Sequence, residues 1–267
     1  MPRVDAAISS GHVTATYLYC IVKSAAKPSL AKVPAGLPGA ERPHVIPVAR
    51  SLWLIVAAVP LDTYGPGPLE RQLADLDRVG RIALAHEAVV EYFAGRAGAT
   101  VIPMKLFTMF SSADRAVADI GTRKDRIAAA MRRIAGAEEW GVRIMRGTAA
   151  APKPAAARAA TGAAFLAARK QARDDARLAR LAAADVAAGA FEHLASIARD
   201  ARQRGDAPAA GASAPLLDAA FLVPASSRAR FRSAARREAG RCAEAGAQMT
   251  LSGPWPAYNF VQGDESR

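Results

Sequence analysis

The stretch from Ile82 to Phe110 constrains the fold more than any other part of the chain. Its first part repeats apolar residues with the 3.6-residue period of an amphipathic helix, at Ile82, His86, Val89, Val90, Phe93 and Ala97. Two glycines then predict the end of that helix. An apolar run over 100–110 predicts a strand, in which Pro103 is tolerated only at an edge or a bulge. Ser111–Asp114 fits a capping box, so a second helix is expected to follow.

The neighbouring segments place this centre in an α+β domain. Runs rich in β-branched and aromatic residues predict strands at 16–22, 44–48, 52–59 and 140–144, the second and third forming a hairpin. Apolar periodicity predicts helices within 69–97 and over 113–134. This order favours a mostly antiparallel sheet with helices on one face, in a ferredoxin-like variant.

The alanine- and proline-rich stretch Gly147–Ala157 predicts the boundary between two domains. The expected organisation is a flexible N-terminal tail, a ferredoxin-like domain, a linker, a smaller helix-rich α+β domain and an extended C-terminal tail, over 1–15, 16–147, 148–157, 158–251 and 252–267. The second domain is expected to hold a long Ala/Arg-rich helix from Thr161 to Arg204. Strands at 219–223 and 249–251, with a helix between them, complete it.

Charge and cysteine content limit the class of protein. The formal net charge of +12 and the pI of about 10.4 favour an acidic partner, although an arginine- and alanine-rich composition also raises the pI without any binding role. No run approaches the roughly 18 apolar residues of a membrane span, and the N-terminus lacks a signal core, so a cytoplasmic protein without a membrane partner is expected. Cys20 and Cys242 are too few for a disulfide framework or a metal site, and we expect two reduced thiols, one in a strand and one on a helix.

The sequence predicts no enzyme, no cofactor site and no metal site. It contains neither a phosphate-binding glycine loop before a helix nor the nucleophile elbow of hydrolases. His86-Glu87 resembles a catalytic or metal-binding pair, but His86 lies on the apolar stripe, which favours a hydrogen-bonded core histidine. Glu138 and Glu139 are neighbours in a predicted strand and therefore point to opposite faces.

Arginines are concentrated in the last predicted helix, at Arg228, Arg230, Arg232, Arg236, Arg237 and Arg241. Arg232, Arg236 and Arg237 form a possible anion patch, with simple solvation as the alternative. A basic nucleic-acid-binding module is therefore the rival function, although the basic-Gly-aromatic pattern of RNA-binding ferredoxin-like modules is absent.

Three aromatic residues near the C-terminus, Trp255, Tyr258 and Phe260, stand out because aromatics make up only 6% of the chain. Prolines flank Trp255 and predict an extended segment. The aromatic side chains are expected either to pack against the domains or to form a docking site for a partner.

The chain resembles the GvpL/GvpF family of gas vesicle proteins over most of its length. The matching motifs are TYLYCIV (16–22), GLPG (36–39), HEAVVE (86–91), VIPMKLFTMF (101–110), EEWGVRIM (138–145), GAAFLAARK (162–170), AFLVP (220–224) and LSGPWPAYNFV (251–261). Three positions depart from the family pattern. Leu106-Phe107-Thr108 replaces a usual Phe-Gly-Thr, Ala257 replaces a common proline, and Cys20 replaces a usual glycine.

The resemblance implies two α+β domains with a packed C-terminal tail and a non-enzymatic role in gas vesicle formation. It implies an accessory or minor component, located at the gas vesicle, that contacts the hydrophobic shell protein and other gas vesicle proteins. An exposed sheet edge or apolar groove would suit such a contact. We expect this surface in the first domain, at Val101, Ile102, Leu106, Phe107 and Phe110.

Overall fold

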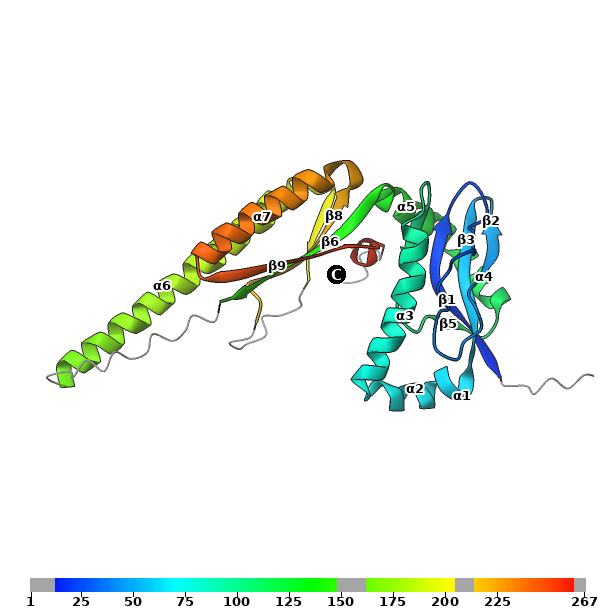
Figure 1. Cartoon of the computed structure of the whole chain (residues 1–267), viewed down its shortest axis with the longest axis horizontal. Helices are drawn as coiled ribbons and strands as arrows, with labels where there is room; N and C mark the ends of the chain where they lie inside the picture. The colour runs from blue at the N-terminus through cyan, green and yellow to red at the C-terminus, as the bar shows by residue number, and fades with distance from the viewer. Residues whose placement is uncertain (1–12, 148–161, 205–213, 262–267) are drawn as a thin grey trace, which may run out of the picture. The chain divides into compact units, whose positions relative to one another are not determined.

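The computed structural model describes residues 13–147, 162–204 and 214–261, which form two compact units (Figure 1). Unit 1 combines the chain up to Ala135 with the segment from Pro256 onward. Unit 2 is Gly136–Trp255. The linker expected at 148–157 and most of the N-terminal tail expected at 1–15 lie outside the described residues.

Unit 1 contains an antiparallel sheet in the order β2-β3-β1-β4. Its strands are β1 (Thr14–Lys23), β2 (His44–Ala49), β3 (Leu52–Pro60) and β4 (Thr100–Pro103), and the short β5 (Met109–Phe110) also pairs with β1. The predicted hairpin of β2 and β3 is confirmed, and β4 lies at the sheet edge where Pro103 is tolerated. β1 and β2 run parallel with β3 between them, which is the ferredoxin-like strand order. A loop over 24–43 joins them in place of a crossover helix.

The helices of unit 1 are α1 (Leu61–Tyr64), α2 (Pro66–Leu73), α3 (Leu76–Ala94), α4 (Ala113–Thr122), α5 (Lys124–Ile134) and the 3₁₀ turn η2 (Tyr258–Phe260). The Ser112 hydroxyl caps α4 by accepting from the Arg115 backbone N–H. The single helix predicted over 113–134 is two helices, because Arg123 leaves the helical conformation.

Both faces of β1 are buried. Tyr17, Tyr19 and Val22 belong to the core formed with α3. Leu18 and Ile21 are also buried but lie outside that core, and α4 contacts β1 and β2. The expected α+β class with an antiparallel sheet is confirmed for unit 1.

Unit 2 has the order strand, helix, two strands, helix, strand of a ferredoxin-like fold. Its elements are β6 (Ala137–Arg146), α6 (Gly162–Ala195), β7 (Asp200–Gln203), β8 (Leu217–Pro224), the 3₁₀ turn η1 (Ala225–Ser227), α7 (Arg228–Glu244) and β9 (Ala247–Trp255). The antiparallel sheet has the order β7-β8-β6-β9. α6 and α7 lie side by side on one face, where they bury Trp140, Phe221 and Phe231 (Figure 1).

Three sequence expectations are wrong in this region. β6 pairs with β8 and β9, so it belongs to unit 2, and the boundary lies at Ala135 rather than at Gly147. The helix predicted to reach Arg204 ends at Ala195 and is followed by the edge strand β7. β7 has the sequence DARQ, which lacks the β-branched and aromatic residues that mark a strand.

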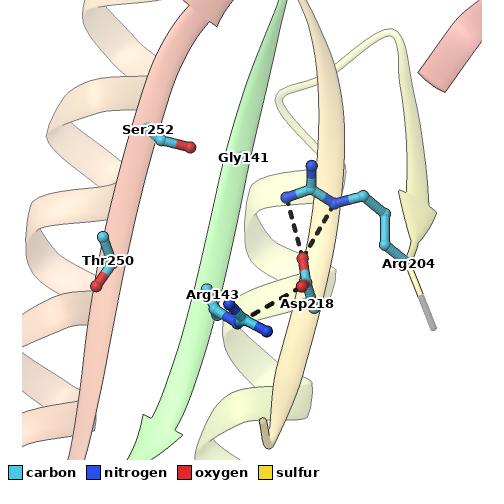
Figure 2. Close-up of a pocket in the computed structure, with 6 residues that line it drawn as sticks. All are labelled: Gly141, Arg143, Arg204, Asp218, Thr250 and Ser252. Carbon is cyan, nitrogen blue, oxygen red and sulfur yellow. Dashed lines mark hydrogen bonds and ion pairs between the residues drawn. The ribbon is translucent and has the colours of Figure 1, made fainter. Parts of the chain in front are cut away.

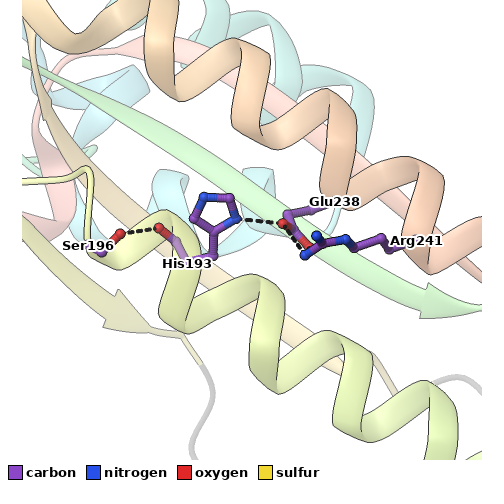
Figure 3. A network of polar contacts seen from close by, with 4 residues as sticks. All are labelled: His193, Ser196, Glu238 and Arg241. Carbon is purple, nitrogen blue, oxygen red and sulfur yellow. Dashed lines mark hydrogen bonds and ion pairs between the residues drawn. The ribbon is translucent and has the colours of Figure 1, made fainter.

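A buried carboxylate links α6 to α7 (Figure 3). Glu238 is 2% exposed, and its Oε1 lies 2.6 Å from His193 Nδ1 and 3.1 Å from Arg241 Nη1. The side chains of His193 and Arg241 are 37% and 65% exposed. Water can therefore solvate the two partners if Glu238 is removed, whereas the buried Glu238 carboxylate loses both of its charged partners if they are removed.

This asymmetry gives a first prediction. Replacing both His193 and Arg241 by Ala leaves a buried carboxylate unpaired and should lower the unfolding free energy by roughly 3 kcal/mol. The control Glu238→Met leaves two solvated groups and should change it by less than about 1 kcal/mol. Urea denaturation followed by circular dichroism measures both, and equal losses would contradict the argument.

Candidate functional site

The five residues expected to contact a partner differ in burial. Val101 and Ile102 are each 6% exposed, so their side chains belong to the interior of unit 1. Leu106, Phe107 and Phe110 are half-buried, as are Thr108 and Met109 between them. Of the five residues, only Leu106, Phe107 and Phe110 are therefore partly accessible, and burial argues against the prediction for Val101 and Ile102.

A turn at Phe107 shapes this segment. Phe107 has φ of 64°, in the left-handed region that favours glycine. Its backbone N–H donates to the Tyr17 hydroxyl at 3.3 Å, and the Thr108 N–H donates to the Lys105 carbonyl at 3.1 Å. The resemblance described above implies a glycine at this position, and the departure from it falls on a backbone conformation that costs about 1 kcal/mol for other residues.

His86 is a core histidine, which confirms the interpretation drawn from its place on the apolar stripe. It is 3% exposed, stacks on Tyr19, and its Nδ1 lies 2.8 Å from the Tyr17 hydroxyl. Burial lowers the pKa of His86 to about 4, against a smaller opposing effect of the Met104 backbone. The imidazole is therefore neutral at pH 7, and the Tyr17 hydroxyl bridges its Nδ1 and the Phe107 backbone N–H, from which it accepts. Within the described residues, no group of three His, Cys, Asp or Glu side chains could hold a metal ion.

The tail aromatics separate into two kinds. The Tyr258 hydroxyl donates to Glu87 Oε2 on α3 at 2.5 Å, and burial raises the pKa of Tyr258. Phe260 is fully buried, and its carbonyl accepts from Arg133 on α5 at 3.5 Å. Trp255 lies in β9 of unit 2 and is 41% exposed. Tyr258 and Phe260 thus complete unit 1, and Trp255 alone is accessible.

The arginines of α7 also have different surroundings. Arg228 pairs with Glu138, and Arg241 pairs with the buried Glu238. Arg232, Arg236 and Arg237 are exposed, and Arg236 donates to the Ser233 hydroxyl at 3.2 Å. These three arginines lie on the accessible side of one helix, and their role as an anion patch stays a prediction.

A polar hollow on the unit 2 sheet was not expected from the sequence (Figure 2). It has a volume of about 440 Å³ and is lined by Gly141, Arg143, Arg204, Asp218, Thr250 and Ser252. The alternation of Trp140, Val142 and Ile144 with polar and small residues was the available signal, because it places Gly141 and the exposed Arg143 on the opposite face of β6.

Burial of the tail predicts unequal effects of two aromatic substitutions. Phe260→Ala removes a fully buried ring and should lower the unfolding free energy by about 3–5 kcal/mol. Trp255→Ala, the matched control at an exposed aromatic, should cost less than about 1 kcal/mol. Thermal and urea unfolding test this, and similar losses for both variants would refute the assignment.

The lowered pKa of His86 predicts a pH-dependent stability. The unfolded histidine titrates near pH 6.5, whereas the folded one titrates near pH 4, so the unfolded state binds its proton first. Acidification from about pH 6.5 to 4 should therefore cost roughly 3 kcal/mol of unfolding free energy through this group. His86→Phe should remove this part of the slope, and an unchanged slope in urea titrations across that range would contradict the prediction.

Comparison with known proteins identifies the family of this chain. A family model described as gas vesicle synthesis protein GvpL/GvpF matches residues 15–262. Gas vesicle protein L of Streptomyces sp. (strain CB03234) is 30% identical over 245 residues, which cover 84% of this chain and 84% of that protein.

The fold is similar to two crystal structures of gas vesicle protein GvpF, each at 15% identity. The one from Anabaena sp. PCC7120 has a TM-score of 0.65 and covers 94% of this chain and 97% of that chain. The one from Microcystis aeruginosa has a TM-score of 0.64 and covers 93% of this chain and 99% of that chain. No helix among the described residues combines the length and apolarity needed to cross a membrane. On the family match and the relative together, this chain belongs to the GvpL/GvpF family of gas vesicle proteins.

Proposed function

We propose that this protein assists gas vesicle formation by binding the hydrophobic shell protein through the segment Leu106–Phe110 of unit 1. Binding would shield the aggregation-prone shell subunit or nucleate its assembly. Membership of the family supports the gas vesicle role, and the observation that carries the contact is a half-buried apolar segment at a strand edge.

The β5 strand provides the backbone for this contact. It pairs with β1 through Phe110 and Met109, and no other strand of the described residues pairs with it. An edge strand presents unpaired N–H and C=O groups that can add a strand from another chain. The apolar side chains at 106, 107, 109 and 110 would supply contacts that do not depend on charge.

The β4 strand is less suited to the same contact. Its Val101, Ile102 and Pro103 side chains are buried. The helices α3 and α5, which contact β4, also receive Tyr258 and Phe260 of the tail. We therefore propose that the partner binds at β5 rather than at β4.

Co-expression capture with the major shell protein of the same gene cluster tests the proposal at low and high salt. Apolar contacts survive salt, whereas contacts between exposed charges weaken. Capture by the unmodified chain is expected at both salt concentrations and should be lost in the double variant Leu106→Ser, Phe110→Ser. The matched control replaces Leu76 and Leu84 by Ser, two leucines of α3 that are 81% and 73% exposed.

The outcomes separate the proposal from its rival. Equal capture by both double variants would sink the assignment to Leu106–Phe110, provided that both variants unfold at the same temperature as the parent. Capture at low salt alone would instead assign the contact to arginines. Nucleic-acid binding by Arg232, Arg236 and Arg237 is the alternative function, because all three are exposed. It requires an oligonucleotide affinity that falls steeply with salt and is lost when the three are neutralised.

A further inference from the structure

The face of the unit 2 sheet opposite α6 and α7 carries a set of converging hydrogen-bond donors (Figure 2). Arg143 on β6 lies opposite Asp218 on β8 and Thr250 on β9. Gly141, two residues earlier, lies opposite Ser252. Arg204, which follows β7, reaches over the sheet toward the same place. Three neighbouring strands and the residue that follows a fourth thus contribute to one hollow.

Gly141 provides the space for this arrangement. A Cβ atom at this position would lie 2.6 Å from Ser252 Oγ, closer than real contacts allow, and 3.0 Å from Arg204 Nη2, which is a tight contact. The absent side chain lets the Arg204 guanidinium and the Ser252 hydroxyl approach β6 from either side. The hollow, of about 440 Å³, therefore depends on glycine in the middle of a strand.

Asp218 holds one of the two guanidinium groups in position. Arg204 Nε donates to Asp218 Oδ1 at 3.0 Å, and Nη2 lies 3.0 Å from the same oxygen and donates to the Ala219 carbonyl at 3.3 Å. The Nη1 atom of Arg204 takes part in neither contact. This guanidinium is oriented by the protein before any ligand arrives, which lowers the entropy lost on binding.

The other donors have unused capacity. Arg143 Nε lies 3.6 Å from Asp218 Oδ2, beyond hydrogen-bond range, and its side chain is 59% exposed. Among the described residues, the Thr250 and Ser252 hydroxyls have no hydrogen-bond partner. Two guanidinium groups and one carboxylate leave the hollow with one positive charge, which matches a single carboxylate.

We propose that this hollow binds a carboxylate side chain from an acidic segment of a protein partner. Arg143 would donate to the carboxylate in a bidentate manner, with the Ser252 hydroxyl and Arg204 Nη1 as further donors. An open sheet face admits an extended peptide. The described residues that line the hollow include no aromatic ring on which a nucleic-acid base could stack, which favours a peptide. The site lies in unit 2 and does not depend on the function proposed for Leu106–Phe110.

Fluorescence anisotropy with a labelled hexaglutamate peptide on the full chain tests the proposal, with hexaglutamine as the neutral probe. The parent should bind hexaglutamate and should not bind hexaglutamine. Arg143→Gln should weaken binding by about tenfold, the effect of one charge-assisted hydrogen bond. Gly141→Ala should weaken it similarly without changing any charge, because the methyl group would displace the Ser252 hydroxyl and the Arg204 guanidinium. Arg236→Gln, at an exposed arginine of α7, is the matched control and should bind as the parent does.

Each other result would overturn the proposal. Equal weakening of peptide binding by Arg143→Gln and Arg236→Gln would show that the peptide is attracted by the net charge of the protein rather than by the hollow. Displacement of the peptide by inorganic phosphate at the same affinity would show a site for small anions, and tighter binding of an oligothymidylate that depends on Arg143 would show a nucleic-acid surface. Should Gly141→Ala fail to fold, Arg143→Gln and Ser252→Ala, both of which leave the backbone unchanged, still decide the question.

Discussion

The antiparallel pairing of β6 with β8 on one side and β9 on the other determines how this chain divides. The pairing places Trp140, Val142 and Ile144 in the core beneath α6 and α7 and places Gly141 and the exposed Arg143 on the opposite face of the strand. It also fixes the course of β9, which ends at Trp255, just before the chain re-enters unit 1 at Pro256. Unit 2 is therefore an insertion in unit 1, whose core is closed by residues from both ends of the chain.

Local sequence patterns predicted which segments form helices and strands better than they predicted which strands pair with one another. β1 and β3 contain continuous runs of β-branched and aromatic residues, and α3 keeps its apolar stripe, so each was identified within a few residues. The strand character of β6 was also visible in its alternation. A period of two residues identifies a strand but not its sheet, and β8, its partner, begins about 70 residues later. β7 was missed because an edge strand of polar residues is stabilised by its neighbour rather than by its own composition.

The same distinction explains what was predicted of the candidate sites. His86 was interpreted correctly because its own helix supplied the evidence. The three tail aromatics were identified as a group, but only the fold separates the buried Phe260 from the exposed Trp255. The hollow around Gly141 could not be predicted, because its residues come from positions more than 100 apart in the sequence and none is unusual alone. At Phe107, the missing family glycine did indicate a real backbone constraint.

The return of the tail to unit 1 has a consequence for synthesis on the ribosome. Residues 14–134 supply the sheet and the five α-helices of unit 1, but Tyr258 and Phe260 reach α3 and α5 only after all of unit 2 has been translated. Contacts of such long sequence separation form late. Unit 2 is one continuous segment of the chain, whereas unit 1 needs a second segment that is translated last. A chain that ends before residue 260 therefore lacks a buried residue of unit 1. Unit 1 should therefore be less stable in a chain that lacks Tyr258 and Phe260 than in the full chain.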